Sequence, residues 1–227
     1  MGETNIDTGF SAGDFRLLEE MAFAGTSVAP RSEARIEALW AKAARLVDGL
    51  GKKLFPSERF TVAIWPDSAQ NERLPFIWAR LKRDVGARYA THIGVFLAPD
   101  QCNLCIDLEK DLLDAGVAAE HLDQVLDFYR CRLAESMGSL GRSDMKVWTD
   151  PHNVVSAGEF PGLDLDCFMD ANTDSGHPWP RIGYRFDATE VQAFAEGWVQ
   201  ETTLRAMPLV PIYDAMIAAY RGGPEPF

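Results

Sequence analysis

Apolar and polar side chains alternate along three consecutive runs of this sequence: Leu74–Lys82, Ala90–Ala98 and Cys102–Glu109. A β-strand sends successive side chains to opposite faces, so a period of two predicts strands. The Pro99-Asp100-Gln101 segment predicts a turn, because proline fixes φ and aspartate can close a turn with its side chain. The stretch therefore predicts the centre of an antiparallel sheet.

Apolar residues at helical spacing lie on both sides of these strands. They predict helices over Asp14–Ala24, over Ser32–Leu50 with Ser32 as the N-cap, and over Ala118–Met137. Gly49 and Gly51 predict the fraying end of the second helix. The other expected strands are Arg59–Trp65, Met145–Trp148 and Arg181–Phe186. A helix is expected from Asp187 or Thr189 to about Met207, where Pro208 and Pro211 kink or break it. A short helix is expected at Ile212–Tyr220.

This order of elements is typical of an α+β fold. We expect a single domain, residues 1–227, in which an antiparallel sheet of about four to six strands packs with amphipathic helices. The helices Ser32–Leu50 and Ala118–Met137 are expected on one face of that sheet. Residues 150–180, rich in proline, glycine, asparagine and aspartate, predict an irregular loop region.

The charge of the chain is strongly negative and unevenly distributed. The formal net charge is −12; residues 1–100 carry 13 basic and 13 acidic side chains, whereas residues 101–227 carry 9 basic and 21 acidic ones. A net negative field repels phosphate backbones, so we expect no non-specific nucleic-acid binding. No apolar run reaches the roughly 18 residues that a membrane span needs, and the Met1 region has no signal-peptide pattern. Four cysteines do not make a disulfide scaffold, so the expected location is the cytoplasm.

Metal and redox motifs are incomplete, and we expect neither a metal nor a cofactor. Cys102 and Cys105 form a CxxC, but within a strand this spacing puts the two thiols on opposite faces. The aspartates from Asp164 to Asp174 lack the glycine and glutamate positions of a calcium-binding loop, which favours a solvated acidic loop. Asp107 and Glu109 share a strand face as in some nucleases, but Lys110, next to Glu109, points the other way.

The candidate ligand site is a basic cluster beside aromatic residues and a histidine. Arg80, Lys82, Arg83 and Arg88 make up this cluster, with Trp78 close by. One interpretation is an anion site, because arginine pairs with carboxylates and phosphates. The other is a charged hairpin end that keeps a sheet edge soluble, with Glu72 or Asp84 neutralising the charges. The expected ligand-binding residues are Arg80, Lys82, Arg88, Tyr89, Thr91 and His92.

The segment Tyr89-Ala90-Thr91-His92-Ile93-Gly94 resembles a Tyr-x-Thr-His-aromatic-Gly segment in a family of uncharacterised bacterial proteins, a domain of unknown function. Cys105–Glu109 is similar to the strand that follows in that family, and Phe194–Met216 to its closing helix. Here Ile93 stands where the family has an aromatic residue. The resemblance implies no activity. It implies that Arg88, Tyr89, Thr91 and His92 act as a unit.

Two functions remain open at this point. The first is a cytosolic binding protein, such as a regulatory or immunity-type partner, that presents its acidic C-terminal half to a protein with a basic surface. The second is a hydrolase or transferase that acts on an anionic or phosphorylated small molecule at the cluster from Arg80 to His92.

Overall fold

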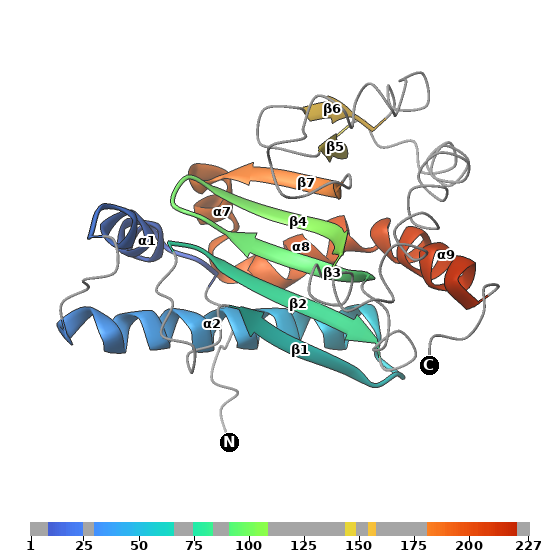
Figure 1. Cartoon of the computed structure of the whole chain (residues 1–227), viewed down its shortest axis with the longest axis horizontal. Helices are drawn as coiled ribbons and strands as arrows, with labels where there is room; N and C mark the ends of the chain where they lie inside the picture. Colours follow the sequence, from blue (N-terminus) through green and yellow to red (C-terminus); the bar gives the residue numbers. More distant parts are fainter. Residues whose placement is uncertain are drawn as a thin grey trace, which may run out of the picture. The chain divides into compact units, whose positions relative to one another are not determined.

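A computed structural model describes residues 9–24, 30–65, 75–83, 91–108, 144–148, 154–157 and 181–221. The expected helix over Ala118–Met137 and the acidic loop from Asp164 to Asp174 lie outside these residues. Within them, helices and an antiparallel sheet occur together, which confirms the α+β class (Figure 1). No helix in the described part is long and apolar enough to cross a membrane.

The chain divides into two compact units. The first comprises Met1–Asp84, Gly94–Leu104 and Arg185–Arg205, and the second comprises Val85–Ile93, Cys105–Tyr184 and Ala206–Phe227. Three strands, β3, β4 and β7, contribute residues to both.

The described strands form one sheet in the order β1-β2-β3-β4-β7-β5-β6. Their bounds are β1 Phe60–Trp65, β2 Ile77–Arg83, β3 Thr91–Leu97, β4 Gln101–Leu108, β5 Lys146–Trp148, β6 Val154–Ser156 and β7 Arg181–Asp187. The pairs β1–β2, β5–β6 and β5–β7 are antiparallel. The predicted strands are thus confirmed to within a few residues. Strand β6 is an addition, because it lies in the 150–180 region that the sequence predicted to be irregular.

In the first unit, helix α2 (Pro30–Leu54) runs along β1 and β2 (Figure 1). Its buried stripe contains Ile36, Leu39, Ala43, Leu46, Val47 and Leu50, as the helical spacing predicted. The predicted ends were wrong at both termini. Ser32 lies inside the helix, which begins at Pro30, because proline fits the first turn without losing a helical hydrogen bond.

Gly51 is an interior residue of α2, although the sequence indicated a fraying end. A Cβ atom at Gly51 would lie 2.5 Å from Cε2 of Phe60 on β1 and 2.8 Å from Cδ1 of Leu81 on β2. The glycine therefore permits a close approach of helix and sheet. This packing explains why α2 continues to Leu54.

Helix α1 (Ala12–Ala24) begins with a capping arrangement between Ser11 and Asp14. The Oδ2 atom of Asp14 accepts hydrogen bonds from the backbone N–H of Ser11 at 2.7 Å and from its hydroxyl at 2.8 Å. The same oxygen accepts a hydrogen bond from Nζ of Lys42 on α2, at 2.7 Å. Asp14 therefore caps α1 and also ties it to α2.

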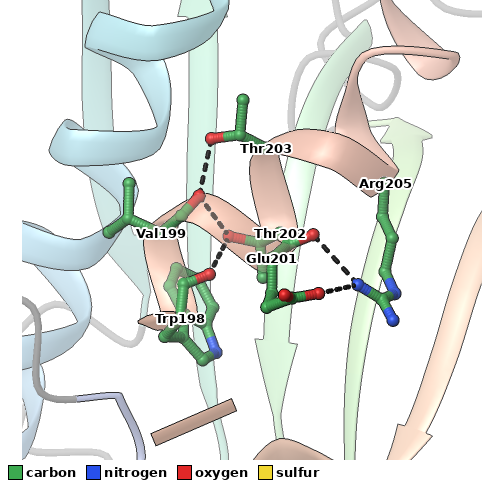
Figure 2. Close-up of polar contacts among 6 residues, drawn as sticks. All are labelled: Trp198, Val199, Glu201, Thr202, Thr203 and Arg205. Atoms are coloured by element: carbon green, nitrogen blue, oxygen red, sulfur yellow. Dashed lines mark hydrogen bonds and ion pairs between the residues drawn. The ribbon is translucent and has the colours of Figure 1, made fainter. Parts of the chain in front are cut away.

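The predicted C-terminal helix is divided into α7 (Ala188–Phe194), a 3-10 turn and α8 (Trp198–Ala206). Asp187 and Glu190 exchange side-chain to backbone hydrogen bonds of 2.8 Å, so Asp187 is the cap, one of the two predicted choices. The Thr202 hydroxyl donates to the Trp198 carbonyl at 2.7 Å, which satisfies this buried polar group within α8; Figure 2 draws the contact as a dashed line.

Helix α9 (Leu209–Arg221) begins earlier than the predicted Ile212. Pro211 lies in its first turn, where a missing N–H breaks no helical hydrogen bond, so this proline does not end the helix. Pro208 lies in the turn between α8 and α9, as expected of a helix breaker.

Candidate functional site

The two faces of the sheet differ in polarity. On β2, Ile77, Ala79 and Leu81 are buried, and Leu81 lies against Gly51 of α2. Side chains alternate along a strand, so Trp78, Arg80 and Lys82 lie on the opposite face. We call this the polar face of the sheet.

Part of the predicted basic cluster lies on this face in the first unit. Arg80 and Lys82 are half-buried, opposite Ala63 and Thr61 of β1. Arg83 belongs to a different environment: its Nε donates to Glu58 at 2.6 Å, and its guanidinium lies 5.1 Å from the Phe55 ring centre. Arg83 is thus neutralised by an ion pair.

The other predicted ligand-binding residues lie in the second unit or outside the described residues. Thr91 and His92 are both fully buried, and as consecutive residues of β3 they lie on opposite faces of the sheet. Arg88 and Tyr89 lie outside the described residues, as do Glu72 and Asp84, the expected neutralising carboxylates. The assembly of the six residues into one site stays a prediction.

Strands β3 and β4 form a hairpin whose register places a carboxylate opposite His92. Ala98 and Gln101 exchange backbone hydrogen bonds of 2.9 and 3.4 Å around the turn Pro99-Asp100. Counting back from this pair along two antiparallel strands puts His92 opposite Asp107. Directly opposed side chains have Cβ atoms about 4.5–5.5 Å apart.

Asp107 also pairs with an arginine from the next strand of the sheet. Nε of Arg181 on β7 donates to Oδ2 of Asp107 on β4, and the exposed fractions of the two side chains are 17% and 1%. Removing such charges from water is costly, and their attraction and hydrogen bonding must offset that cost. In the second unit, the Arg181–Asp107 ion pair therefore persists because its attraction and its hydrogen bond offset the cost of removing the charges from water.

Strand β5 adds a second cation beside Arg181. In the β5–β7 register, Trp148 is opposite Arg181 and Lys146 is opposite Gly183, so all four lie on one face. Diagonal neighbours across an antiparallel pair are about 7–8 Å apart, which places Lys146 near Arg181. Lys146 is half-buried, and its side chain makes no hydrogen bond or ion pair with any residue that the structure describes.

These residues of the second unit form what we call the buried charge cluster: His92, Asp107, Lys146 and Arg181. Histidine can exchange a proton near neutral pH, aspartate can orient a neighbouring donor, and the two cations can hold an anion. Of these four residues, the sequence indicated only His92 as a ligand residue. Asp107 was recognisable, because a carboxylate in a strand of apolar neighbours needs a partner. Nothing in the sequence around Arg181 or Lys146 indicated that these two residues lie beside Asp107.

The two described cysteines belong to the interior. Cys102 and Cys105 are both buried, and burial raises the pKa of the Cys102 thiol to about 12. A thiol with so high a pKa stays protonated, which agrees with the prediction that Cys102 is a core residue. Within the described residues, no group of three or more His, Cys, Asp or Glu side chains could hold a metal ion.

The fold and the cluster define an α+β protein with charged residues buried on one face of its sheet. No protein family matches the chain, and no match is found among curated proteins. The resemblance of the segment from Tyr89 to Gly94 to a bacterial family stays a prediction.

Proposed function

We propose that the buried charge cluster binds a small molecule that carries a carboxylate or phosphate group. The single observation that carries this proposal is Lys146, a half-buried ammonium without a counter-ion among the described residues, next to the Arg181–Asp107 pair. A partly desolvated cation gains stability from a bound anion.

The charges of the cluster support this choice of ligand. Lys146 and Arg181 carry two positive charges, and Asp107 supplies one negative charge. The hydrogen bond from Nε of Arg181 to Asp107 also holds the guanidinium in one orientation. An oriented cation binds an anion better than a mobile one, because less side-chain entropy is lost on binding.

The position of His92 supports an extension of the proposal to catalysis. His92 lies opposite Asp107 on the neighbouring strand, and a histidine beside a carboxylate is a common arrangement for moving a proton during hydrolysis or group transfer. On this extension, the anionic ligand is a substrate, and His92 donates or accepts the proton at its reacting group. His92→Gln would then abolish turnover but leave anion binding measurable.

Calorimetric titration of the full chain with inorganic phosphate, and separately with succinate, tests the binding proposal. Lys146→Met removes the ammonium but keeps most of the side-chain stem. We expect this variant to bind about tenfold more weakly, since a hydrogen bond to a charged group contributes about 1.5–3 kcal/mol. Lys53→Met, on the exposed end of α2, removes the same charge and should bind like the parent. No binding by the parent, or equal binding by both variants, would contradict the proposal.

The charge asymmetry of the sequence supports a second candidate, a protein partner with a basic surface. Residues 101–227 hold 21 acidic side chains, and Glu190 and Glu196 of the described part are exposed. Complementary charges accelerate and orient association. A pull-down at low and high salt separates this candidate from the first, because a partner held by exposed charges is released as the salt concentration rises.

A further inference from the structure

Asn103 on β4, in the first unit, is a buried polar residue without a visible role in the fold. The residue is only 6% exposed, and its Oδ1 atom accepts no hydrogen bond within the part of the chain that the structure describes. A buried carbonyl oxygen that has left water without a new donor destabilises the folded state. Such a group therefore requires an explanation.

The surroundings of Asn103 on the polar face are aromatic. The hairpin register places Asn103 opposite Phe96 of β3. The Phe96 ring lies 5.2 Å from the Phe76 ring and 6.4 Å from the Trp78 ring, measured between centroids. All three rings are only half-buried. The amide thus lies beside an aromatic surface that keeps some exposure.

We propose that this aromatic–amide site, formed by Asn103, Phe76, Trp78 and Phe96, binds a purine-type base. An asparagine carboxamide presents a donor and an acceptor side by side, which complement the amino group and ring nitrogen on one edge of adenine. Aromatic side chains stack on bases of any sequence, because every base has a π-face. A bound adenine would supply the donor that Oδ1 of Asn103 lacks.

The aromatic–amide site is separate from the proposed anion site, because it consists of different residues and would bind a different chemical group. A ligand-binding role of Asn103 can also be distinguished from a purely structural role. If Asn103 served folding alone, its replacement by leucine would lower the melting temperature by removing a needed polar contact. If it serves a ligand, Asn103→Leu should melt at the same or a higher temperature without ligand, because a buried carbonyl oxygen that lacks a donor has been replaced by an apolar group of similar size.

Calorimetric titration of the full chain with adenosine, a neutral nucleoside, tests the proposal. We expect adenosine to bind the parent, and Asn103→Leu to bind it at least tenfold more weakly. Phe96→Leu, which removes a stacking ring, should also weaken binding. Thr203→Val is the matched control, because the Thr203 hydroxyl donates to the Val199 carbonyl within α8, at 2.6 Å, and should bind like the parent.

Ribose 5-phosphate separates this proposal from the anion site, since it carries the charge without the base. If Asn103→Leu does not fold, Asn103→Asp supplies a second test, because it keeps the size of the side chain but removes the donor. Failure of the folded parent to bind adenosine would overturn the proposal, and so would equal affinity of the parent and a folded Asn103 variant. Phosphate binding could persist in either case, so the two proposals can fail separately.

Discussion

Arg181 on β7 donates its Nε–H to Oδ2 of Asp107 on β4, where the carboxylate is 1% exposed. The two residues are 74 positions apart in the sequence. Neighbouring strands of the same sheet bring them together. The pair is part-buried, because the Asp107 side chain is enclosed and the Arg181 side chain keeps some exposure.

Removing the cation of this pair should be more harmful than removing both charges. Arg181→Met removes a cation that pairs with the buried Asp107 carboxylate, and we expect it to lower the free energy of unfolding by about 3–5 kcal/mol. The double variant Asp107→Leu with Arg181→Met should cost clearly less. Urea denaturation of the single and double variants measures the coupling. A loss below about 1 kcal/mol in Arg181→Met would mean that the pair is not a stability determinant.

Substitutions at two glycines should have opposite effects. In Gly51→Ala, the new Cβ would meet the Phe60 ring and Leu81, so we expect a loss of about 1–3 kcal/mol through overpacking. In Gly197→Ala, nothing lies within 4 Å of the new methyl group, and the reduced freedom of the unfolded chain should add about 0.4–1 kcal/mol. Thermal and urea unfolding of both variants provides the comparison. Equal effects of the two substitutions would argue against close packing of α2 on β1 and β2.

The contribution of Asp14 should depend on pH. Burial alone would raise the pKa of this carboxyl, but hydrogen bonds from Lys42 and Ser11 outweigh burial and hold it below its ordinary value of 3.8. A lowered pKa means that the charged form stabilises the fold above that value, and that this stability is lost as the pH falls through the folded-state pKa. Asp14→Asn should therefore cost about 1 kcal/mol at pH 7.

Urea unfolding of Asp14→Asn at a series of pH values measures this dependence. The difference from the parent should shrink as the pH falls below 3.8. Glu19→Gln, an exposed position on the same helix, removes the same charge and serves as the control. A difference that stays constant down to pH 2 would show that the Asp14 charge is not what stabilises the cap.

Cys102 should resist alkylation in the folded protein. Burial raises the pKa of its thiol to about 12, so the reactive thiolate is scarce near neutral pH and the sulfur is covered. Because the pKa is raised, the stability from the neutral thiol is present below its ordinary value of 9.0 and is lost as the pH rises through about 12. Treatment with iodoacetamide and mass spectrometry should find Cys102 modified in urea but not in buffer. Rapid labelling in buffer would contradict its assignment to the core.

Local patterns in the sequence determined the types of most elements. The alternation in Ala90–Ala98 and Cys102–Glu109 identified the β3–β4 hairpin, because a strand with a buried face must repeat every two residues. The spacing from Ile36 to Leu50 identified α2, and Asp187 was recognisable as a helix cap. These features depend on neighbouring residues alone, so they can be read without the fold.

Helix ends and the positions of polar residues were decided by the tertiary structure. Gly51 looked like a helix end, but the close approach of Phe60 and Leu81 keeps it inside α2. The sequence indicated Asp107 and Arg181 only as separate residues of two strands. The sheet makes them neighbours, because the pairing order of strands distant in sequence depends on how their buried faces pack. The same order sets Lys146 beside Arg181, so the charge cluster is a property of the sheet rather than of any one segment.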